Sequence, residues 1–287
     1  MILSPKHSFV VQKIFPSIGR CIYCGATEGL SDEHIIPYSL AGTYVFRDAS
    51  CPSCRDITSR DELLCARGIF GSLRVAHGFP TRRKGERPKH VEVEVESAGV
   101  RTKIEVPADR APTSPLFAPI FPIAGILVGR EPSEEVPGIQ YQVIFPFPPD
   151  HDERLQRLKK DGPTHIRVRA NWGLNPFMCL LAKITHGFAV AGYGADSFLP
   201  VLPNYVLDKD RRLAHVIGGT NDPILVPEPG IAGLNSENPV HAWQLGIRSI
   251  GDTNYVAVHL QLFRYLHYPV YEVIAGEASD ALVRRVL

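Results

Sequence analysis

Four cysteines in the first 54 residues form two Cys-x-x-Cys pairs. The first pair is Cys21 and Cys24, and the second is Cys51 and Cys54. Each pair directs two sulfur atoms at one point, and two pairs can close the tetrahedral site that structural zinc prefers. The 26 residues between the pairs exceed the usual gap of about 15–20 residues, which indicates an insertion. Two disulfides or four unrelated thiols are the alternatives.

The cysteines and the insertion together resemble the HNH endonucleases, and more narrowly a zinc-stapled subgroup with a Glu-His-Ile-Ile-Pro core. The insertion carries the run Asp32-Glu33-His34-Ile35-Ile36-Pro37, and the resemblance covers about residues 18–65. It implies a ββα-metal fold, in which a two-stranded hairpin is followed by a helix and pinned to it by zinc. It also implies DNA as the partner and phosphodiester hydrolysis as the activity.

The resemblance assigns a role to each residue of the Glu-His pair. His34 matches the general base, and imidazole suits that task because it titrates near neutral pH. Glu33 matches the acidic ligand of a catalytic divalent ion, which would be Mg²⁺ or Mn²⁺ because hard ions prefer carboxylate oxygens. Zinc would then be structural and separate. The alternative role for His34 is that of a zinc ligand or of a hydrogen-bond donor behind one.

One position departs from the family pattern. The family usually has His or Asn directly after the last cysteine, as a second ligand of the catalytic ion, but this chain has Arg55. Arginine has no lone pair to offer a cation, although its guanidinium could hold the scissile phosphate. We expect Glu62, two helical turns later on the same face, to supply the missing ligand, with Asp56 as the second candidate. A solvated helix face with charge partners is the alternative for both.

Charge favours a polyanionic partner near the N-terminus. Residues 1–90 contain 13 Lys and Arg against 8 Asp and Glu, whereas residues 91–287 contain 18 against 22. The most basic cluster, which could contact DNA phosphates, is Arg82-Arg83-Lys84. A solvated linker is the alternative reading of a cluster this short.

Elements that would position the motif can be placed from the pattern around it. The first strand is expected to end near residues 33–36, and a return strand to follow within residues 38–46. Asp48 or Ser50 can cap a helix that begins near Cys51 and ends at Gly68.

The remaining chain predicts a second unit of α+β type. His90–Glu96 alternates strictly and pairs with 100–106 as a hairpin. A strand is expected at 140–145, a short helix at 150–160, a strand at 165–170, an apolar helix at 175–190 and a short helix within 197–207. Three terminal strands follow at 241–250, 255–263 and 270–274, which favours a mostly antiparallel sheet with one long helix packed on it.

Two domains are therefore expected: residues 1–85, an HNH-like zinc and nuclease module, and residues 86–287, an α+β domain of substrate recognition or partner contact. The whole chain has 287 residues and 44% apolar content, which is typical of a globular protein. No apolar run reaches the length of a membrane span. No signal peptide precedes the cysteines, so we expect a reducing, cytoplasmic location.

Two classes of function follow from these residues. The first is a metal-dependent HNH-type endonuclease acting on DNA. The second is a non-catalytic zinc module that binds nucleic acid or protein, because Arg55 replaces an expected ligand. A zinc deaminase is excluded, since its signature places His-x-Glu before Pro-Cys-x-x-Cys, whereas here Glu33 precedes His34 and Ser50 precedes Cys51.

Overall fold

The fold is that of a computed structural model of the chain. The structure describes residues 12–81, 89–160, 162, 165–167, 173–220 and 240–287. Within them the fold is mixed α and β with mostly antiparallel sheets, which confirms the expected α+β class.

The N-terminal elements form a small sheet followed by helices. Strands β1 (Lys13–Phe15), β2 (Ser31–His34) and β3 (Tyr44–Ser50) lie in the order β1-β3-β2, with β2 antiparallel and β1 parallel to β3. The 3-10 helix η1 (Tyr38–Leu40) joins β2 to β3. Helix α1 (Pro52–Leu64) begins directly after the sheet. Two antiparallel strands and a helix follow one another as expected, but the return strand spans Tyr44–Ser50, later than the expected range of 38–46.

The end of α1 differs from the expectation. The chain continues as the π-helix η2 (Cys65–Ile69) and then as α2 (Gly71–Ala76), so Gly68 does not stop it. The π-helical turn η2 is stabilised because its residues Cys65, Ala66 and Ile69 are buried in the core. The expected caps are also wrong: Cys51 is the N-cap residue, and it makes no side-chain capping bond.

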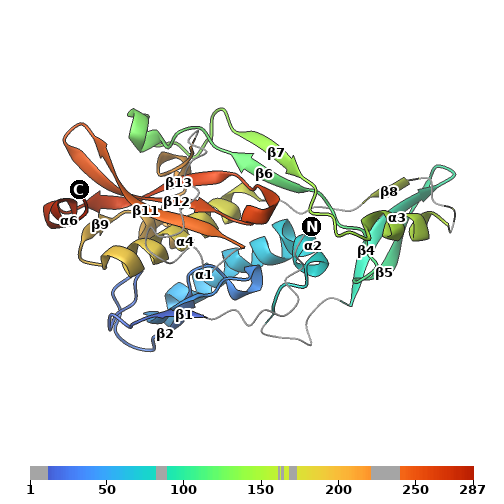
Figure 1. Cartoon of the computed structure of the whole chain (residues 1–287), viewed down its shortest axis with the longest axis horizontal. Helices are drawn as coiled ribbons and strands as arrows, with labels where there is room; N and C mark the ends of the chain where they lie inside the picture. The colour runs from blue at the N-terminus through green and yellow to red at the C-terminus, as the bar shows by residue number, and fades with distance from the viewer. Residues whose placement is uncertain (1–11, 82–88, 161, 163–164, 168–172, 221–239) are drawn as a thin grey trace.

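The larger sheet lies at the C-terminal end of the chain and is antiparallel. It has the order β10-β13-β12-β11, with β9 paired to β13. Its strands are β9 (Phe198–Pro200), β10 (Ile217–Gly219), β11 (Ala242–Ile250), β12 (Thr253–Gln261) and β13 (Val270–Ala278). Helix α4 (Leu174–Tyr193) packs between this sheet and α1 (Figure 1). The terminal strands and the long helix confirm the expectation, whereas only the second half of 197–207 is helical.

Helix α4 is the central element of the core. By length and composition it is apolar enough to cross a membrane. However, 72% of its most apolar 18-residue stretch is buried inside the protein. Its apolar residues therefore have a packing role in this fold. One hydrophobic core runs from the N-terminal elements through α4 to the terminal sheet.

A smaller unit extends from the main body at one end of the molecule (Figure 1). Strands β4 (His90–Ser97), β5 (Val100–Pro107) and β8 (His165–Arg167) form a sheet in the order β5-β4-β8, beside helix α3 (His151–Lys159). Its own small core contains Val93, Val95 and Val106. The hairpin of β6 (Leu116–Ile120) and β7 (Gln140–Ile144) connects this unit to the main body.

The remaining short elements are 3-10 helices and short α-helices. They are η4 (Gly125–Val128), α5 (Leu202–Val206), η5 (Leu213–His215), η6 (Arg264–Leu266) and α6 (Asp280–Val286).

Candidate functional site

The four cysteines of the two Cys-x-x-Cys pairs meet in one place. The Sγ atoms of Cys21, Cys24, Cys51 and Cys54 all lie within 4.8 Å of one another, and those of Cys24 and Cys51 are 3.6 Å apart. A tetrahedral ion with zinc–sulfur bonds of about 2.3 Å separates its sulfur ligands by about 3.8 Å. The cluster can therefore hold a metal ion such as zinc.

Two local structures present these sulfurs. After Cys24, Gly25 adopts a φ of +79° and donates its backbone N–H to the carbonyl of Cys21 at 2.9 Å, closing a tight turn. Glycine takes that conformation without steric cost. The second pair lies at the start of α1, where Cys51 is the N-cap residue and Cys54 is in the first turn.

The helix start favours ionisation of one thiol. Burial opposes a charge on Cys51, but the backbone N–H of Cys54 and the neighbouring thiols outweigh it and lower the pKa of Cys51 to about 7. Free N–H groups and the positive end of the helix dipole stabilise a thiolate in such a position. Thiolates are the form that binds metal.

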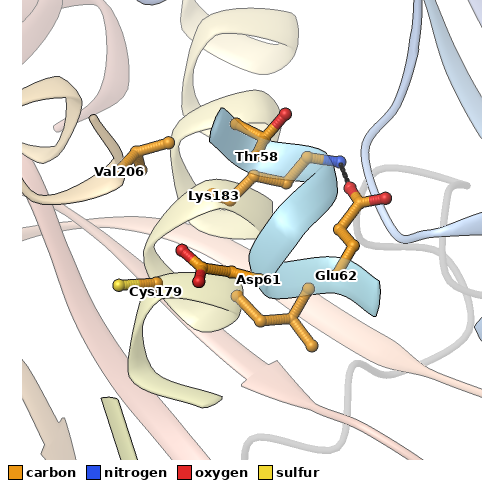
Figure 2. Close-up of a pocket in the computed structure, with 7 residues that line it drawn as sticks. Thr58, Asp61, Glu62, Cys179, Lys183 and Val206 are labelled. Atoms are coloured by element: carbon orange, nitrogen blue, oxygen red, sulfur yellow. Dashed lines mark ion pairs between the residues drawn. The ribbon is translucent and has the colours of Figure 1, made fainter. Parts of the chain in front are cut away.

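A second cluster of charged groups lies beside the first one. Glu33 on β2 and Glu62 on α1 both form ion pairs with Lys183 of α4, at 2.6 Å and 2.8 Å respectively. Figure 2 shows the Lys183 ammonium directed at the Glu62 carboxylate, whereas Asp61 is directed toward Cys179. The side chains of Glu33 and Lys183 are 8% and 3% exposed, and that of Glu62 is 25% exposed.

Lys183 also binds the backbone of the Glu-His-Ile-Ile-Pro segment. Its Nζ donates to the carbonyl of Ile35 at 3.1 Å and to the carbonyl of His34. Burial alone would lower the pKa of Lys183, but Glu33 and Glu62 outweigh it and raise the pKa above its ordinary value. The ammonium is therefore charged and is surrounded by oxygen atoms.

The Tyr23 hydroxyl lies near these carboxylates. Burial raises its pKa, and Glu33 and Glu62 raise it further. The hydroxyl is buried and has no hydrogen-bond partner among the described residues.

Both carboxylates and His34 line a groove of about 1050 Å³. Its lining includes residues of β2, η1, α1 and α2, together with residues of β4 and of the segment 108–114. The ring of His34 meets that of Tyr38 edge-on, with centroids 5.6 Å apart. Arg74 supports the wall by donating to the carbonyls of Ser39 at 2.7 Å and Ala66 at 2.9 Å.

The other predicted site residues differ in their position relative to the groove. Arg55 lines the groove and donates to the hydroxyl of Ser31 at 3.1 Å. Asp56 is exposed on α1 and is not among the residues that line the groove. The basic cluster Arg82-Arg83-Lys84 lies outside the described residues.

The sequence reasoning missed Lys183. A signal was present, because Lys183 is the only Asp, Glu, Lys or Arg between Leu174 and Tyr193. A single charge in an apolar helix needs a buried partner of opposite sign. The sequence pattern could therefore have predicted acidic partners for Lys183, but it could not have identified them as Glu33 and Glu62.

No protein-family model, no curated protein and no solved structure matches the chain.

Proposed function

We propose that the chain is a metal-dependent endonuclease of the HNH type that hydrolyses phosphodiester bonds in DNA. One observation carries the proposal: Glu33, His34 and Glu62 line one groove beside a cluster of four cysteines. Carboxylates and an imidazole are the groups that this hydrolysis needs, and a closed thiolate site is the usual form of structural zinc.

In this proposal, zinc on the four cysteines has a structural role. Cys21 and Cys24 precede β2, and Cys51 and Cys54 begin α1, so one ion would tie the start of the strand pair to the helix. Such a tie fixes Glu62 of α1 relative to Glu33 of β2. The positions of the two carboxylates would thus depend on zinc.

The residues of the groove would divide the chemistry among them. His34 would accept a proton from the attacking water, and Arg55 would donate hydrogen bonds to the phosphate. Glu33 and Glu62 fit a hard divalent ion, Mg²⁺ or Mn²⁺, because both line the groove and carboxylate oxygens are the ligands that hard ions prefer. When bound, that ion supplies positive charge that stabilises the negative charge developing on the phosphate.

Plasmid cleavage tests the proposal. Supercoiled DNA is incubated with the wild-type protein and with His34→Ala, with Mg²⁺ and with Mn²⁺. We expect nicking by the wild type and a loss of at least about a hundredfold in His34→Ala, with metal content and circular dichroism unchanged. His165→Ala removes an exposed histidine on β8 and is the matched control that should keep full activity.

Equal cleavage by the wild type and His34→Ala would reject the role of His34. No cleavage by either protein across metals and DNA forms would reject the nuclease.

A second candidate is a zinc-dependent module that binds nucleic acid or protein without cutting. One observation favours it: Lys183 already places a positive charge between Glu33 and Glu62, as expected if no divalent ion binds there. This candidate predicts that the protein shifts labelled DNA in a binding assay, or captures a protein partner, but leaves DNA intact with every metal.

A further inference from the structure

Lys183 is a buried cation of α4 whose partners come from the end of β2 and from α1. Its residue is 2% exposed, and it reaches from α4 to Glu33 of β2, to Glu62 of α1 and to the carbonyls that end β2. A lysine side chain loses much conformational entropy and hydration when it is buried. Its place in the core therefore rests on this set of oxygen atoms.

The partners of Lys183 form an oxygen cage of the type that holds metal cations. The cage consists of Glu33 Oε1, Glu62 Oε1 and the carbonyl oxygens of His34 and Ile35. Carboxylate and carbonyl oxygens are also the ligands that hard ions take in proteins. An ammonium group has three N–H donors, and these four acceptors can take all of them. Lys183 thus acts through its partners and not by binding a substrate.

The cage also sets the net charge of the candidate ion site. Two carboxylates and one ammonium leave a net charge of −1, whereas the carboxylates alone would carry −2. Lys183 approaches from the side of α4 and is not among the residues that line the groove, whereas both carboxylates are. The groove side of the pair therefore presents only one net negative charge to a divalent ion.

We propose that Lys183 is a positioning residue that stands in for a cation in this cage, so that the site holds a divalent ion weakly until a phosphate adds its negative charge. The inference rests on the divalent-ion site of the proposed function. Ion binding and DNA binding then assist one another, because the phosphate restores the charge that Lys183 neutralises. An ion at this site is held firmly only with substrate present.

Manganese binding without DNA tests this role. Free Mn²⁺ is measured by its electron paramagnetic resonance signal in titrations of zinc-loaded wild type, Lys183→Gln and Lys209→Gln. We expect Lys183→Gln to bind Mn²⁺ at least about tenfold more tightly than the wild type, because the glutamine amide still donates hydrogen bonds but carries no charge. Lys209→Gln removes an exposed charge and should bind as the wild type does. Unchanged or weaker binding by Lys183→Gln overturns the proposal, since a purely structural lysine predicts weaker binding.

The coupling to phosphate has its own measurement. A short DNA duplex is added to His34→Ala protein, with and without Lys183→Gln. We expect the duplex to tighten Mn²⁺ binding strongly when Lys183 is present and less when it is replaced. An equal effect of the duplex in both proteins overturns the coupling.

A loss of folding in the variant leaves the proposal testable. If the ammonium stands in for a cation, Mn²⁺ should raise the melting temperature of Lys183→Gln and Lys183→Met more than that of the wild type. A melting temperature that Mn²⁺ does not restore overturns the proposal.

These measurements without cleavage separate the inference from the nuclease itself. Mn²⁺ binding as expected without any DNA cleavage would keep the cage and reject the enzyme. DNA cleavage by the wild type together with unaltered Mn²⁺ binding in Lys183→Gln would keep the enzyme and reject the role of Lys183.

Discussion

Glu33 and His34 are neighbours in the chain, but their surroundings differ. The Glu33 carboxylate is buried against Lys183, whereas the imidazole of His34 meets Tyr38 at the groove. Successive side chains of a strand point to opposite faces, and β2 ends at His34. This alternation gives the two side chains different neighbours, although both residues line the groove.

Gly42 supports the same segment from the following loop. A Cβ atom at Gly42 would lie 1.9 Å from the carbonyl oxygen of Ile36. Contact with backbone cannot be relieved by turning a side chain, so we expect Gly42→Ala to lower the free energy of unfolding by about 3 kcal/mol or more. Urea denaturation measures this change.

Gly246→Ala is the matched control for that substitution, because a Cβ atom there meets nothing within 4 Å. We expect it to change stability by less than about 1 kcal/mol. Similar losses in both variants would contradict the steric argument at Gly42.

At the scale of elements, the site depends on how β2, β3 and α1 are joined. Strands β2 and β3 pair as neighbours, and the cysteine cluster links the turn at Cys21–Cys24 to the start of α1. The backbone N–H of Ile22 also donates to the carbonyl of Ala49 on β3 at 2.9 Å. A metal ion at the cluster would therefore hold the turn, the strands and the helix together.

Loss of one sulfur should break that link. We expect Cys24→Ser to reduce zinc from about one ion per chain to near zero and to expose residues 12–81 to limited proteolysis, because energy of metal binding is also folding energy. Atomic absorption and mass mapping of the cleavage sites measure both effects.

Cys179→Ala serves as the control for Cys24→Ser. This thiol lies on α4 outside the cluster, so the variant should keep its zinc. Zinc retained by Cys24→Ser would show that the four thiolates are not the ligand set.

At the scale of the whole molecule, buried histidines of the C-terminal half hold the N-terminal segment. His186 of α4 hydrogen-bonds to the carbonyl of Ile22 at 2.7 Å. His241 bonds to the carbonyl of Leu40 at 2.8 Å and accepts the N–H of Phe263 at 3.3 Å. Such contacts join the two halves across one core.

His241 should make folding sensitive to acid. Burial lowers its pKa from 6.5 to about 4, although its bond to Leu40 partly opposes that shift. Below pH 6.5 the histidine is protonated in the unfolded chain, whereas in the folded chain it stays neutral down to about pH 4. The free energy of unfolding therefore falls as the pH falls from 6.5 to 4. Between pH 7 and pH 5 the loss from His241 alone is about 2 kcal/mol.

Replacement by glutamine isolates this contribution. We expect His241→Gln to lose about 2 kcal/mol less than the wild type between pH 7 and pH 5 in urea denaturation, because glutamine does not titrate there. His165→Gln, at an exposed position, should follow the wild type. Parallel pH curves for the wild type and His241→Gln would contradict the assignment.

Local signals explain which elements the sequence could predict. The β4–β5 hairpin, α3, α4 and the three terminal strands follow from alternation, periodicity and turn residues, and they lie where expected within a few residues. Gly68 and residues 197–201 differ from the expectation. A glycine after a helix-like run favours a stop, but burial of Cys65 and Ile69 keeps the chain helical, and pairing with β13 makes residues 198–200 a strand.

The sequence by itself determined the thiol cluster, since two Cys-x-x-Cys turns specify their own geometry, and it singled out Glu33, His34 and Glu62. Only the tertiary structure decided that Glu33 and Glu62 share the cation Lys183, which comes from more than a hundred residues further along the chain. A short motif determines the geometry of its own segment. A buried ion pair depends on which helix packs against that segment in the folded protein. The charge of the candidate ion site is therefore a property of the fold.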